Sequence, residues 1–173
     1  MSGKFVAGII VVLSLIAGAA IYYLQVYAYY EEVAPDGTND VQLTSLASGA
    51  PEPILYEAFE GIEASSSPIR FRACFTTPQS LAMLTETYEV YDAAEPLVAP
   101  GWFDCFDAQE IGAALESGEA LPFLSEKNVQ YGIDRVAAIM PDGRGFLWHQ
   151  INACGEEVFD GKPVPEGCPP LEE

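Results

Sequence analysis

The pattern of apolar and polar positions separates an apolar N-terminal segment from a longer mixed one. Residues 5–24 carry no charged side chain and are almost entirely apolar. A helix of this length spans about 30 Å, which is the thickness of the hydrocarbon core of a bilayer. Because a lone segment in lipid must satisfy its own backbone hydrogen bonds, the run predicts a transmembrane helix that contacts the lipid bilayer through residues 5–24.

The residues around this run predict its orientation. Lys4 is the only charged side chain before Glu31, so the positive-inside rule places the N-terminus in the cytoplasm. We therefore expect an anchor in the bacterial inner membrane and a periplasmic C-terminal part. An aromatic belt for the membrane–water interface follows at Tyr22, Tyr23, Tyr27, Tyr29 and Tyr30. A cleaved signal peptide is the alternative, since residues 17–19 are small, but the apolar and aromatic character continues to Tyr30 and favours a retained anchor.

The remainder of the chain predicts one small α+β domain. Residues 31–40 are polar and rich in turn formers, which indicates a linker between an anchor of residues 1–30 and a domain of residues 41–173. Strands and helices alternate irregularly, which is typical of an α+β fold with an antiparallel sheet. The local patterns predict a short strand at 41–46 and a half-buried strand at 69–75, and they leave 51–63 undecided between helix and strand. They predict one helix capped by Thr77 and a second from Asp107 and Glu110 to Gly118. A hairpin of 129–140 and 146–152 and an irregular tail from Gly161 complete the expected domain.

The charge of the chain excludes one class of function. All 26 acidic side chains, but only six of the seven basic ones, follow residue 30, and the net charge is −19. Affinity for nucleic acid depends on clustered cations, so we expect no nucleic-acid binding. The first interpretation of this charge is solubility or adaptation to a salty habitat. Such a surface would also repel anionic membrane surfaces and could attract a cationic partner such as a basic periplasmic protein.

Few residues could carry chemistry. His149 is the only histidine, and no metal-ligand spacing, glycine-rich cofactor loop or catalytic constellation accompanies it. We therefore expect no catalytic residue, no cofactor and no metal. Arg70 and Arg72 alternate with Phe71 on the predicted strand, so they would share a face that could bind an anion. In a chain with 26 acidic side chains, we expect them to pair with carboxylates instead. Arg70, Arg72 and His149 are thus weak binding candidates, and a structural role is expected for His149.

Several segments resemble an uncharacterised alphaproteobacterial family of small single-span membrane proteins, a domain of unknown function. The similar segments read IYYLQVYAYYEEV, DVQLTSL, RACFTTP, APGWFDCFDAQEIGAAL and YGIDRVAAIMPDGRGFLWHQIN. The resemblance extends over nearly the whole chain. The resemblance implies a single-span envelope protein, and it offers no catalytic residue to transfer to this sequence.

Three functions follow from these observations. The first is a membrane-anchored periplasmic accessory or binding protein that assists an envelope or respiratory complex, with another membrane protein or a basic periplasmic protein as its partner. The second is a periplasmic hydrolase that uses acidic residues with His149. The third is a sensor, which ranks last because only residues 1–4 precede the apolar run.

The four cysteines predict two disulfides. An even number of cysteines in an oxidising compartment favours disulfide pairing, and no C-x-x-C motif indicates a catalytic thiol pair. Four cysteines allow three pairings. We expect Cys74–Cys105, because a strand and a helix between them could bring the two together, and Cys154–Cys168, because the proline-rich tail has no other evident attachment.

Overall fold

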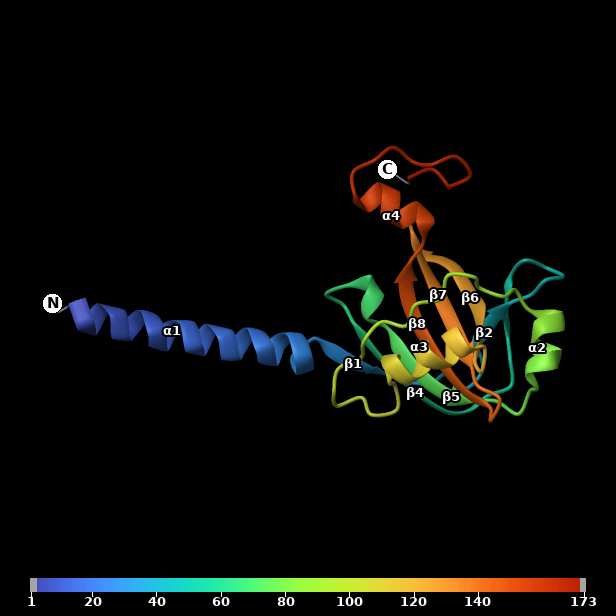
Figure 1. The fold of residues 1–173 in the computed structure, drawn as a ribbon, viewed down its shortest axis with the longest axis horizontal. Coiled ribbons are helices and arrows are strands. Elements are labelled where there is room, and N and C mark those ends of the chain that lie inside the picture. The colour runs from blue at the N-terminus through green and yellow to red at the C-terminus, as the bar shows by residue number, and fades with distance from the viewer. Residues whose placement is uncertain (1–2, 172–173) are drawn as a thin grey trace.

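The computed structural model describes residues 3–171, so the first two residues of the expected anchor and the last two of the expected domain lie outside it. Helix α1 (Gly3–Tyr23) continues as a π-helical turn at Leu24–Ala28. Together they form an apolar helix long enough to cross a membrane, and it is exposed along its whole membrane-length window. Figure 1 shows that α1 projects away from the rest of the molecule.

The rest of the chain folds around a six-stranded antiparallel sheet. Its strand order is β1-β4-β5-β8-β7-β6, and a separate two-stranded sheet is formed by β2 and β3. The strands are β1 (Tyr30–Val33), β2 (Gln42–Thr44), β3 (Pro51–Pro53), β4 (Glu57–Ala64), β5 (Arg72–Thr76), β6 (Leu121–Gln130), β7 (Ile133–Ile139) and β8 (Arg144–Ile151). The helices are α2 (Leu81–Thr87), α3 (Ala108–Ser117) and α4 (Ala153–Phe159), with a 3₁₀ turn at Pro68–Arg70. The predicted α+β class is confirmed.

Two apolar clusters lie on opposite faces of this sheet. On one face, Leu43 of β2 and Leu84 of α2 pack against Phe75 of β5. On the other face, Ile111 of α3 packs with Trp148 of β8, and α3 crosses the sheet there in Figure 1. Side chains of one strand alternate between faces, so β5 supplies both clusters. The strand expected at residues 69–75, which corresponds to β5, was predicted to have one buried face. This prediction is wrong, because both faces of β5 are covered.

The strand expected at residues 69–75 begins only at Arg72. Pro68 starts a 3₁₀ turn that ends at Arg70, and proline suits the first position of such a turn because it has no N–H to donate. Arg70 and Arg72 therefore do not share a strand face. The undecided segment 51–63 forms β3 and most of β4.

The two predicted helices have different outcomes. The helix expected to begin at Thr77 begins at Leu81, because the hydroxyl of Ser80 accepts the hydrogen bond of the first turn. The helix predicted after Asp107 is confirmed: the Asp107 carboxylate accepts from two N–H groups of the first turn. It ends at Gly118, whose φ of +74° is the left-handed conformation that glycine adopts without strain.

The C-terminal region contains two elements that the sequence pattern does not predict. The segment expected as one strand at 129–140 is divided by a turn at Gly132 into the end of β6 and the start of β7. Helix α4 follows β8 directly, so Cys154 lies in its first turn rather than at the end of a strand. A Cβ on Gly155 would lie 2.2 Å from the carbonyl oxygen of Gly132, so α4 needs glycine where it packs on that turn.

Strand β1 lies where the anchor and the linker were expected to meet. Tyr30–Val33 pairs with the end of β4, with Tyr30 opposite Ala64 and Val33 opposite Gly61. The sheet therefore begins only two residues after the π-helical turn. The division of the chain into residues 1–30, 31–40 and 41–173 stays a prediction.

Both expected disulfides are formed, Cys74–Cys105 and Cys154–Cys168. Cys105 precedes α3 in the chain, so the first bond attaches the loop before α3 to β5. The second bond attaches the tail after α4 to the first turn of that helix. The tail itself is irregular after Gly161, as expected.

The two bonds should stabilise different parts of the molecule. The loops they close contribute about 3 to 4 kcal/mol each in the chain-entropy model. The pair Cys154→Ser and Cys168→Ser should release residues 161–171 to limited proteolysis and leave the cleavage pattern of the sheet unchanged. The pair Cys74→Ser and Cys105→Ser should lower the free energy of unfolding of the whole domain. Equal protection of the tail in both variants would contradict this assignment.

Candidate functional site

The three arginine and histidine candidates lie in three different environments. Arg72 is 4% exposed, and its guanidinium donates to the backbone carbonyls of Ile69, Phe71, Leu97 and Val98 at 2.6–3.3 Å. The expected pairing with carboxylates is therefore wrong. Burial lowers the pKa of Arg72 to about 10, but the group stays cationic at neutral pH. Arg72 thus attaches the loop at residues 97–98 to β5.

His149 is a buried part of the sheet. Its Nδ1 donates to the carbonyl oxygen of Pro68 at 2.7 Å, and its Nε2 accepts from Arg135 Nε at 3.0 Å, which fixes a neutral imidazole. The ring stacks on Phe71. Burial, followed by the nearby cations Arg135 and Arg72, lowers the pKa of His149 to about 4, against the opposing hydrogen bond to Pro68. Both ring nitrogens are engaged, so the geometry is that of a structural histidine.

Arg70 reaches the end of the apolar helix. Its Nη2 donates to the side-chain carbonyl of Gln25 at 2.5 Å, and its guanidinium carbon lies 5.7 Å from the ring centre of Tyr30. A cation over an aromatic ring is attractive, and arginine presents a planar group that suits this contact. Arg70 therefore connects the 3₁₀ turn before β5 to the π-helical turn, 45 residues away in sequence.

Trp102 makes a second contact with the same helix end. Its indole Nε1 donates to the backbone carbonyl of Val26 at 2.6 Å, and its ring contacts Tyr27 and Tyr30 at centre-to-centre distances of 6.4 and 5.8 Å. Carbonyls in the last turn of a helix lack partners within the helix, so Val26 can accept this bond. We call the contacts of Trp102 and Arg70 with residues 25–30 the helix–domain junction.

A groove lies next to this junction. It has a volume of about 490 Å³ and is lined by residues 59–62 of β4, residues 102–105 of the loop before α3, and Glu32, Val33 and Pro35 at the start of the domain. We call it the β1 groove. Trp102 belongs to both the groove and the junction, so the position of the groove is fixed relative to the end of the apolar helix.

The lining of the β1 groove combines acidic and apolar groups. Glu32, Glu60 and Asp104 are exposed, whereas Ile62 and Phe103 are buried. Carboxylates above an apolar surface suit a ligand with an aliphatic stem and a cationic end, such as a lysine or arginine side chain. Among residues 3–171, no group of three or more metal-ligating side chains could hold a metal ion.

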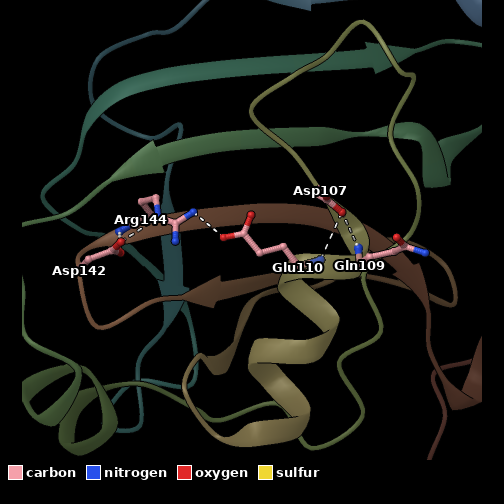
Figure 2. Close-up of polar contacts among 5 residues, drawn as sticks. All are labelled: Asp107, Gln109, Glu110, Asp142 and Arg144. Atoms are coloured by element: carbon pink, nitrogen blue, oxygen red, sulfur yellow. Dashed lines mark hydrogen bonds and ion pairs between the residues drawn. The ribbon is translucent and has the colours of Figure 1, made fainter.

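A second polar cluster lies on the exposed face of α3 and serves a structural purpose. Figure 2 shows Arg144 between Glu110 and Asp142, at 2.9 and 2.8 Å. The same figure shows Asp107 at the start of α3, where its carboxylate accepts from the N–H groups of Gln109 and Glu110. Because these ion pairs are about half exposed, each contributes little free energy. The cluster attaches the β7–β8 turn to α3.

Sequence reasoning did not find the junction or the groove. Arg70 was expected on a strand, and the sequence pattern did not single out Trp102. The available signal was chemical: the indole N–H of a tryptophan usually has a partner, and the tyrosine-rich helix end offers carbonyls. The groove has no sequence signal, because its acidic residues come from segments about 30 to 70 residues apart in a chain rich in acids.

His149 should make stability depend on pH. The unfolded chain binds a proton at this side chain near pH 6.5, whereas the folded chain binds it only near pH 4. Stability is therefore fully present above pH 6.5 and falls as the pH falls towards 4, by about 3 kcal/mol in total. His149→Gln should flatten this part of the curve relative to the wild type in urea unfolding at pH 7.5 and pH 4.5. The same pH dependence in both proteins would contradict the burial of a neutral imidazole.

Comparison with known proteins gives a family assignment. No curated protein and no solved structure matches the chain. A family model, described as "Family of unknown function (DUF6446)", matches residues 41–169. The matched segment contains both apolar clusters, both disulfides, Arg70 and Trp102, and it confirms the resemblance to a domain of unknown function. The chain therefore belongs to this family of unknown function, DUF6446.

Proposed function

We propose that the chain is an accessory protein anchored in the bacterial inner membrane, which binds another protein through its periplasmic domain. The observation that carries this proposal is the helix–domain junction. Trp102 and Arg70 each contact the last turn of the apolar helix. With α1 in the membrane, these contacts would hold the β1 groove at a fixed height and angle beside the bilayer. A fixed position favours a partner that is itself in or on the membrane.

The apolar helix supports the anchoring part of the proposal. The helix Gly3–Ala28 is long and apolar enough to cross a membrane, and its 18-residue apolar window is fully exposed. An exposed apolar surface of this size needs cover, which lipid provides for residues 5–24. The tyrosines at the end of the helix would then lie at the membrane–water interface, where Trp102 joins them. The N-terminus would be cytoplasmic and the domain periplasmic.

The charge of the domain indicates the chemistry of the partner. All 26 acidic side chains follow residue 30, against six basic ones. Anionic lipid would repel this domain, so the surface of the bilayer is a poor partner for it. A protein with a cationic surface would be attracted. We propose that this partner belongs to an envelope or respiratory complex.

No observation favours the hydrolase over this role. The ring nitrogens of His149 are occupied by Pro68 and Arg135, and the side chain is 5% exposed. A general base must reach the proton of a substrate or a water molecule, and this ring does not.

Affinity purification tests the proposed function. The native protein, tagged at its C-terminus, should be recovered from detergent-solubilised membranes together with a stoichiometric partner identified by mass spectrometry. The variant Trp102→Ala with Arg70→Ala loosens the junction and should recover less of that partner. Arg144→Ala, which removes an exposed arginine that pairs with Glu110 and Asp142, serves as the control and should recover the wild-type amount. Recovery of the wild type as a free monomer would contradict the proposal.

A further inference from the structure

One edge of the six-stranded sheet is covered by another segment of the chain, and the other edge is open. The edge at β6 is covered by the segment before α3: Val90 bridges to Phe123, and the N–H of Leu124 donates to the carbonyl of Glu89 at 2.9 Å. The N–H of Tyr91 donates back to β6 at 3.1 Å. An uncovered edge offers a row of free backbone groups to any other strand, and this one has been closed.

The edge at β1 remains open. Within residues 3–171, β1 pairs with β4 on one side and with no strand on the other. Its central residues, Glu31 and Glu32, are both exposed. A second copy of this chain that paired through the same edge would bring their carboxylates together, and like charges on neighbouring strands are destabilising. The open edge therefore suits a strand that carries positive charge.

The β1 groove lies on one face of this open edge. The strand register places Glu32 opposite Ile62 and Glu60 opposite Cys74, so these side chains share the face to which Cys105 is bonded. A strand added beside β1 would place every second side chain on this face, about 5 Å from the strand that carries Glu32. Glu31 lies on the opposite face, because neighbouring residues of a strand point in opposite directions.

We propose that the open edge of β1 and the β1 groove together bind an extended segment of a partner protein in which lysine or arginine alternates with apolar residues. The backbone of that segment pairs with β1 as a seventh strand of the sheet, which is a recurrent mode of peptide recognition. Its basic side chains enter the groove, where their stems pack near Ile62 and Phe103 and their charges meet Glu32, Glu60 and Asp104. This inference rests on the proposed function and names the partner's chemistry and binding mode.

A binding measurement with a defined probe tests the groove. The probe is a fluorescent peptide of four Lys-Val repeats, and the protein is the full chain in nanodiscs of phosphatidylcholine, which carry no net charge. The groove variant combines Glu32→Gln, Glu60→Gln and Asp104→Asn. The control variant combines Glu57→Gln, Glu86→Gln and Glu116→Gln, which are exposed positions outside both β1 and the groove with the same change in net charge.

The groove variant should bind the peptide about tenfold more weakly than the wild type, and the control within about twofold. Equal weakening in both variants would overturn the inference, because it would show attraction to the net charge alone. Absence of binding to the wild type would overturn it as well. So would two copies of the chain associating through this edge in the nanodisc, measured by mass photometry.

Methylated peptides test the strand pairing. N-methylation of every lysine or of every valine removes the backbone donors from one edge of the peptide and leaves the other edge intact. Pairing with β1 predicts that one methylated peptide loses at least about tenfold in affinity and the other does not. Equal affinity of the two methylated peptides would overturn strand addition.

The purification experiment separates this inference from the proposed function. If the groove variant and the control recover the natural partner in equal amounts, the groove inference fails and the accessory role stands. If the wild type recovers no partner, the accessory role fails, whether or not the Lys-Val peptide binds to the chain.

Discussion

The hydrogen bond from the indole of Trp102 to the carbonyl of Val26 is the contact on which the placement of the domain depends. The last turn of any helix leaves carbonyl groups without hydrogen-bond donors. In the apolar helix, the carbonyl of Val26 accepts from Trp102, which lies 76 positions further along the chain. Arg70 makes a parallel contact with Gln25. A linker alone would leave the domain free to rotate about the helix end. These two contacts give it one orientation.

The position of Trp102 depends in turn on the interior of the domain. The disulfide Cys74–Cys105 attaches its loop to β5, and the buried guanidinium of Arg72 binds the carbonyls of Leu97 and Val98 at the start of the same loop. A buried arginine is costly unless all its donors are satisfied, so this group defines the path of the loop tightly. The chain of contacts therefore runs from the apolar helix through Trp102 to β5, the third strand of the sheet. The β1 groove is the space left between that loop and the first two strands.

The sequence predicts the features that depend on local pattern. The apolar run, the helix between Asp107 and Gly118 and the β7–β8 hairpin follow from periodicity, capping and turn chemistry. The number of cysteines predicts two disulfides, and the places of Cys74 and Cys105 and of the proline-rich tail predict their pairing. The helix cap at Ser80 was missed because Thr77 and Pro78 offer the same signal three residues earlier. Helix α4 was missed because it is short. It is capped by Asn152, whose side chain accepts from two N–H groups of its first turn, and Gly155 lets it pack closely against Gly132.

The sites depend on long-range contacts, which pattern does not contain. Arg72 was expected to bind a carboxylate because acids are abundant, but its burial under a loop leaves backbone carbonyls as its nearest acceptors. Arg70 and Trp102 meet the helix end only after the sheet has formed. The acids of the groove cannot be told apart from the others in the sequence, since only the register of β1 with β4 brings Glu32 and Glu60 to one face.

The contacts of the helix–domain junction predict that the domain and the apolar helix move as one rigid unit. Nuclear magnetic resonance relaxation of the domain amides, with the full chain in a nanodisc, measures this coupling. A rigid junction predicts that the domain reorients with the slow correlation time of the whole disc, and that Trp102→Ala with Arg70→Ala lets it reorient several times faster. A wild-type domain that already reorients as fast as this variant would show that Trp102 and Arg70 do not hold the domain to the helix.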